Sequence, residues 1–78
     1  MSHLRTIIER VNLRKDKENF EEDSLFIQSV CNLREYMYLY DNYSESEKND
    51  ACELFAKYSY VLRKEDLERI EEARKGRR

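Results

Sequence analysis

The chain has 78 residues, enough for one domain with a modest hydrophobic core. Its two cysteines and one histidine lack the spacing of a metal site or a disulfide framework, so we expect reduced thiols, no bound metal and no cofactor. The amino terminus mixes charge into its apolar residues and has no long hydrophobic run typical of a signal peptide or a membrane-spanning helix. These features predict a cytoplasmic protein without a membrane segment.

Charge is unevenly distributed along the chain. The net charge is only −2, so total charge does not indicate a nucleic-acid or membrane partner. Residues 20–50, however, contain eight acidic and two basic side chains, and the flanking segments are each net +2. The last five residues include four cations, and we expect residues 74–78 to form a frayed basic tail rather than a nucleic-acid arm.

The first predicted helix begins after Ser2, which can cap it. Apolar residues then recur at i, i+3, i+4 and i+7, namely at Leu4, Ile7, Ile8 and Val11. There is no proline, and the only glycine is Gly76, so helix formers continue almost without interruption. The pattern predicts an amphipathic helix that fades within residues 12–18.

A second helix is predicted from Asn19, a candidate cap with Glu22 three residues later. Its apolar seam alternates four and three residues apart, at Phe26, Val30, Leu33, Met37 and Tyr40. Further apolar residues lie off this seam, which indicates a central helix or an interface. Residues 36–40 also alternate aromatic and aliphatic as in a strand, but a single strand would have no partner, and we favour helix.

A third helix is predicted after the polar connection 41–44, because Ser44 and Glu47 form a strict capping box. Its buried face comprises Ala51, Leu54, Phe55, Tyr58, Val61 and Leu62. Leu67 is out of phase with that face, so either this helix continues to about residue 75 or a short fourth helix follows a bend near 63–66. We therefore predict an all-α protein, a single domain over residues 1–78 with an antiparallel three-helix arrangement and a long third or short fourth helix.

The residues give little support to catalysis or to duplex binding. His3 lies near the terminus, and no glycine-rich phosphate loop is present, so we expect no enzyme. A helix-turn-helix would direct Glu45, Glu47 and Asp50 at phosphates, and this repulsion argues against direct DNA binding.

The predicted binding site is a stripe of tyrosines at i, i+4 and i+7, namely Tyr36, Tyr40 and Tyr43. Such a stripe could equally be core or interface; the seam would bury Tyr40 and leave the other two at its edge. The predicted acidic rim, which would steer a basic partner, consists of Glu35, Asp41, Glu45 and Glu47.

These residues suggest a regulatory or inhibitory protein that docks on a larger protein or on a second copy, with a homodimer or a tight complex as the expected state. The alternative is an acidic mimic of nucleic acid that occupies the binding groove of a DNA- or RNA-binding protein. A third hypothesis is RNA binding by residues 74–78. The composition is also typical of small bacteriophage proteins that redirect host machinery.

Overall fold

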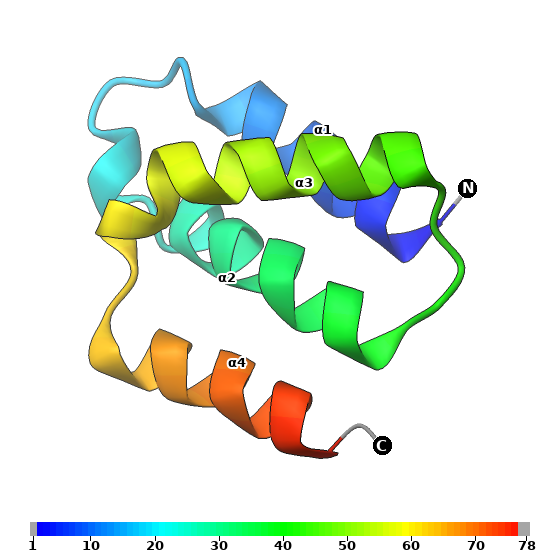
Figure 1. Cartoon of the computed structure of the whole chain (residues 1–78). Helices are drawn as coiled ribbons and strands as arrows, with labels where there is room; N and C mark the ends of the chain where they lie inside the picture. The colour runs from blue at the N-terminus through cyan, green and yellow to red at the C-terminus, as the bar shows by residue number, and fades with distance from the viewer. Residues whose placement is uncertain (1, 77–78) are drawn as a thin grey trace.

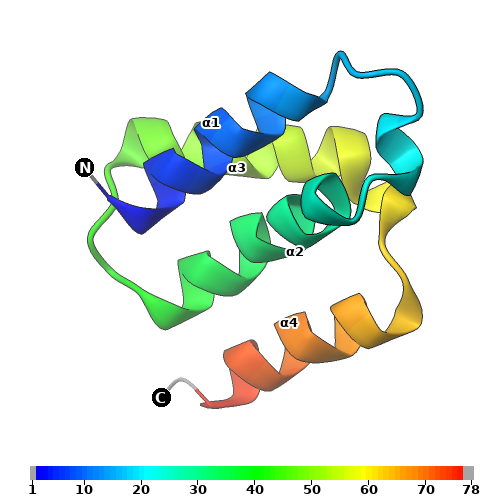
Figure 2. The same ribbon diagram turned by 180° about the vertical axis from the view of Figure 1, so that it is seen from behind.

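The structure is a computed structural model that describes residues 2–76, and it is all-helical within that range. The helices are α1 (His3–Arg14), α2 (Ser24–Leu39), α3 (Glu45–Tyr58) and α4 (Lys64–Gly76). Two short 3₁₀ turns, η1 (Phe20–Glu22) and η2 (Ser59–Val61), precede α2 and follow α3. As Figures 1 and 2 show, α2 lies in the middle, with α1 and α3 on one side and α4 on the other. The central position predicted for the second helix is thus confirmed, and α1 to α3 are compatible with the expected antiparallel packing.

The main core lies where α1, α2 and α3 meet. Its buried residues are Leu4, Ile7, Ile8, Val11, Phe26, Val30, Leu33, Ala51 and Tyr58. Edge-to-face contacts among Phe20, Phe26 and Tyr58, with ring centroids 5.0 to 5.8 Å apart, close one end of this core. The apolar stripe predicted on the first helix is therefore its buried face.

The predicted seam of the second helix is fully buried as far as Leu33, and Met37 packs against the same core. Met37 is partly buried, and α2 ends at Leu39, so Tyr40 is a carboxyl-terminal cap with extended backbone. Tyr40 is 38% exposed, and the prediction that the seam buries it is wrong. The helical repeat cannot place Tyr40 in the core because the helix has already ended.

The predicted helix starts at Ser2 and Ser44 are confirmed. The Ser2 hydroxyl accepts a hydrogen bond from the Arg5 amide, and α1 ends at Arg14, inside the expected range. Ser44 accepts from the Glu47 amide at 3.2 Å, while the Glu47 carboxylate accepts from the Ser44 amide at 2.9 Å. Both halves of the capping box are therefore formed.

The cap predicted at Asn19 is wrong. Asn19 adopts a left-handed conformation (φ 60°), makes no side-chain cap and starts η1 instead. The helix begins four residues later, where the Asp23 carboxylate accepts from the Leu25 amide at 3.0 Å. Asparagine tolerates the left-handed region better than most residues, which suits it to the turn rather than to the cap.

The fourth helix is separate, which resolves the two alternatives for residues 63–75. The backbone is extended at Leu62, and the Arg63 amide donates to the Asp66 carboxylate at 3.1 Å, the back-bond of a capping box. Helix α4 continues to Gly76, so Arg74 and Lys75 lie in its last turn; Arg77 and Arg78 of the predicted basic tail lie outside the described residues.

Helix α4 packs on α2 through a smaller apolar contact, apart from the main core. Ile70 and Ala73 on α4, and Ile27 and Cys31 on α2, are buried but do not belong to the main cluster. The Cys31 thiol donates to the Asp66 carbonyl at 3.4 Å. The described helices include none long and apolar enough to span a membrane.

Candidate functional site

Two of the predicted tyrosines meet at one end of the molecule. The Tyr36 and Tyr40 rings pack edge to face with centroids 5.2 Å apart. The His3 ring, from the start of α1, lies 4.5 Å from Tyr40 and 6.1 Å from Tyr36. We call these three rings, His3, Tyr36 and Tyr40, the aromatic corner. Tyr36 meets the other two rings edge to face, a favoured geometry, and the His3 and Tyr40 rings are tilted by 34° to each other.

Tyr43 is not part of the aromatic corner. Because α2 ends at Leu39, the predicted i, i+4, i+7 stripe does not extend to it. Its hydroxyl donates to the Met37 carbonyl at 3.3 Å, and its ring packs against the main core. The sequence placed Tyr43 at the exposed edge and Tyr40 in the core, whereas the structure covers Tyr43 and leaves Tyr40 more exposed.

The predicted acidic rim is divided between two sides of the molecule. Glu47 lies beside the aromatic corner, where it accepts from Ser44 and from the Ser2 hydroxyl. Glu45 is exposed in the first turn of α3, and Asp41 is exposed in the preceding connection. Glu35 instead faces α4, where it pairs with Arg69 at 3.2 Å. Three of the four rim residues, all except Glu35, therefore lie at the end of the molecule that carries the aromatic corner.

The charge of Glu47 is stabilised by its neighbours. The Ser2 hydroxyl and the Ser44 amide both donate to it and hold the pKa of this carboxyl below its ordinary value. Arg5, one turn into α1, adds a favourable charge and also pairs with Asp50 at 3.5 Å. The carboxylate therefore stays ionised and ties the starts of α1 and α3 together.

The sequence did not identify His3 as part of the site. Its partners Tyr36 and Tyr40 follow it by more than thirty residues, and no periodic pattern links them. The contact depends on how α1 packs against the end of α2, which local spacing does not specify.

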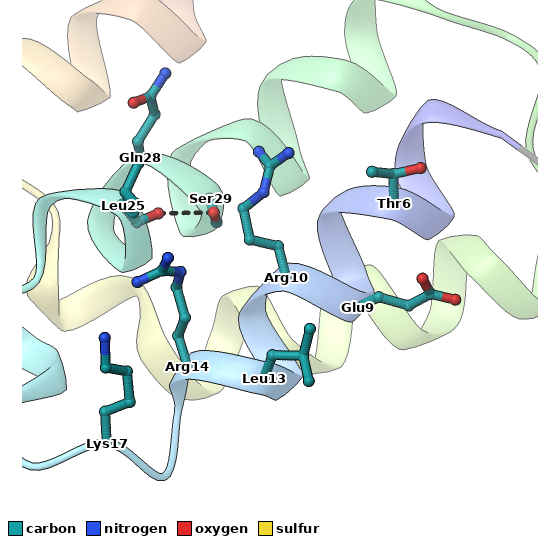
Figure 3. Close-up of a pocket in the computed structure, with 9 residues that line it drawn as sticks. All are labelled: Thr6, Glu9, Arg10, Leu13, Arg14, Lys17, Leu25, Gln28 and Ser29. Atoms are coloured by element: carbon teal, nitrogen blue, oxygen red, sulfur yellow. Dashed lines mark hydrogen bonds between the residues drawn. The ribbon is translucent and has the colours of Figure 1, made fainter.

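A second surface is a groove between α1 and α2, drawn in Figure 3. It encloses about 770 Å³, and we call it the basic groove after the cations that line it. Its lining residues are Thr6, Glu9, Arg10, Leu13, Arg14, Lys17, Leu25, Gln28 and Ser29. Leu13 is 80% exposed here.

One acid neutralises part of the basic groove. Asp23 pairs with Arg14 at 2.8 Å and with Lys17 at 3.6 Å. Desolvation acts to raise the pKa of Asp23, but hydrogen bonds from Arg14 and from the Leu25 and Phe26 amides outweigh it, and the pKa lies below its ordinary value. The Arg10 side chain has no ion pair or hydrogen bond to any other residue of 2–76. The groove thus keeps an unpaired cation beside exposed leucines.

Groups suited to covalent or metal chemistry do not gather at either surface. In the range that the structure describes, no three His, Cys, Asp or Glu side chains are placed to hold a metal ion. Cys31 is buried, and burial raises the pKa of its thiol to about 11, so it is a poor nucleophile near neutral pH.

Comparison with protein-family models, curated proteins and solved structures found no significant match. Function is therefore inferred from the chemistry of the surfaces themselves.

Proposed function

We propose that this chain is a small non-enzymatic regulatory protein that docks on a larger protein through the aromatic corner. The observation that carries the proposal is a set of three rings that pack on one another at the surface, with Tyr40 38% exposed and His3 exposed. Tyrosine is enriched among the residues that dominate binding energy, because its ring buries a large area and its hydroxyl keeps a polar contact. Rings that are already ordered lose little entropy on binding.

The surroundings of the corner favour a basic partner. Asp41 and Glu45 are exposed at the same end of the molecule, and acidic groups around an apolar contact steer positively charged surfaces toward it. In this proposal, an antiparallel bundle of α1, α2 and α3 presents the corner, and the protein acts in the cytoplasm by covering a functional surface of its target. A phage origin would agree with this role.

The acidic-mimic alternative receives less support from the described side chains. A mimic needs carboxylates that are available to a nucleic-acid-binding groove, but most of those in residues 20–50 already serve the fold. Caps, ion pairs or hydrogen bonds engage Glu21, Asp23, Glu35, Glu47 and Asp50. We therefore favour the aromatic corner as the binding surface.

The proposal is tested by affinity capture with matched tyrosine variants. Wild type, Tyr40→Ala and Tyr60→Ala are immobilised, and proteins retained from a bacterial lysate are identified by mass spectrometry. Tyr60 is the control because it is 64% exposed, lies beyond the opposite end of α3 and, among residues 2–76, has a side-chain hydrogen bond only to Glu21. We expect a protein that wild type and Tyr60→Ala retain and that Tyr40→Ala binds about tenfold more weakly or worse.

Two results would count against this assignment. Equal retention by all three proteins would place the binding surface elsewhere. A steep loss of binding with added salt, without any effect of Tyr40→Ala, would favour the acidic mimic, because screening weakens charge contacts far more than aromatic ones.

A further inference from the structure

The basic groove combines unsatisfied charge with exposed apolar surface. Figure 3 shows the Arg10 and Arg14 side chains extending from α1 toward α2, with Leu13 at the edge and Lys17 in the turn that follows. Asp23 pairs with Arg14 and Lys17, which leaves Arg10 unpaired among the described residues. Such a groove suits an occupant that is acidic and carries an apolar side chain.

A surface of that chemistry lies on the same chain, on α4. Glu65, Glu68 and Glu72 recur at i, i+3 and i+7, which puts them along one side of the helix, and we call them the acidic ridge. All three are exposed, and none of their side chains forms an ion pair or hydrogen bond with another residue of 2–76. Leu39, 52% exposed, lies beside them in the same shallow depression.

The two surfaces also match in length. Arg10 and Arg14 lie four residues apart on α1, and Glu68 and Glu72 lie four residues apart on α4, which corresponds to about 6 Å along each helix axis. Two cations of the groove and two carboxylates of the ridge can therefore align over the same distance, while Leu39 supplies an apolar contact for Leu13. We infer that the acidic ridge of one copy docks in the basic groove of a second copy.

This contact joins different surfaces of the two copies. The groove lies on α1 and α2 and the ridge on α4, which packs on the other side of α2 (Figures 1 and 2). Each copy that offers its ridge keeps a free groove, so association continues head to tail and does not stop at a twofold dimer. The aromatic corner takes no part in this contact, and the inference does not depend on the proposed function.

Two double variants test the groove and the ridge independently, and neither variant reverses a charge. The groove variant carries Arg10→Gln and Leu13→Ala, and the ridge variant carries Glu68→Gln and Glu72→Gln. All four residues are exposed on helices, so both proteins should keep the fold, as circular dichroism would verify. Glu71→Gln is the control on α4, because Glu71 lies off the ridge and pairs with Arg74.

Sedimentation velocity over a range of concentrations and ionic strengths measures the association. Wild type and Glu71→Gln should form species larger than a dimer at low salt and dissociate as salt rises. Each double variant should associate about tenfold more weakly or less. An equimolar mixture of the two variants should form a 1:1 complex that grows no further, because only the groove variant's ridge and the ridge variant's groove remain intact.

Three results would overturn the inference. Wild type could stay monomeric at every concentration at low salt. The double variants could associate as strongly as wild type, or their mixture could fail to form the 1:1 complex. Tyr40→Ala should leave self-association unchanged, so failure here and failure of the proposed function are distinguishable.

Discussion

The rate at which a reagent modifies the Cys31 thiol should measure how often α4 detaches from α2. Its side chain is fully buried under α4, and burial raises its thiol pKa from an ordinary 9.0 to about 11. That change alone lowers the reactive thiolate fraction about 100-fold near neutral pH. We therefore expect a thiol reagent to modify Cys31 far more slowly than Cys52, which is partly exposed on α3 and serves as an internal reference.

The informative perturbation is Ile70→Ala, because Ile70 is the largest buried apolar residue that α4 contributes. Truncation of a buried isoleucine costs about 2 to 5 kcal/mol. Taking about 2 kcal/mol for this edge position, α4 should undock about 30-fold more often, and Cys31 should be modified about 30-fold faster. The rate at Cys52 should stay nearly constant, because the main core does not include α4.

Peptide-resolved mass spectrometry during alkylation gives both rates in one sample, and Leu67→Ala, at an exposed position on α4, is the control. If both cysteines accelerate together in Ile70→Ala, α4 opens only when the whole domain unfolds, and a separate α2 to α4 contact is refuted. Equal rates at the two cysteines in the wild type would show that α4 does not cover Cys31.

Other predictions concern the stability of the fold. Phe26→Ala should lower the free energy of unfolding by about 3 to 5 kcal/mol in urea melts. Tyr40→Ala should lower it by only about 1 kcal/mol, because only ring contacts are lost. Equal losses in the two variants would show that Tyr40 belongs to the core. Ser44→Ala should lower the free energy of unfolding by about 1 kcal/mol and leave the slope of that free energy against urea concentration unchanged. A negligible effect would show that the capping box does not contribute to stability. The pKa values of Asp23 and Glu47 in the folded protein lie below their ordinary values, so the unfolded chain takes up protons at a higher pH than the folded protein does. The free energy of unfolding should therefore be highest near neutral pH and should fall as the pH drops below about 5 and through the folded-state pKa values. Urea melts at several pH values should show a shallower fall for Asp23→Asn, and an unchanged slope would mean that this carboxylate is not responsible.

Local features of the fold were predictable from the sequence. A cap forms within one turn of its helix, so Ser2 and the Ser44 and Glu47 pair indicated helix starts without knowledge of the rest of the fold. The stripe from Leu4 to Val11 identified the buried face of α1, because only one face of a short charged helix can be apolar.

Other features depended on competition between signals or on distant contacts. Asn19 and Asp23 could each cap α2, and the left-handed turn at Asn19 left that role to Asp23. The end of α2 at Leu39 has no proline or glycine to mark it, so the apolar spacing predicted a seam that continued to Tyr40. The aromatic corner needed His3 to meet residues from the far end of α2, and only the packed fold brings them together.

One carboxylate links the beginnings of two helices that lie far apart in the sequence. Glu47 completes the cap of α3 and also accepts from Ser2, the residue that caps α1. Both helix starts carry partial positive charge, and their close approach would be unfavourable without an anion between them. Fraying at either start must therefore weaken the other, so the two ends should melt as one cooperative unit. Since His3 is the first residue of α1, loss of this shared contact would also loosen the aromatic corner.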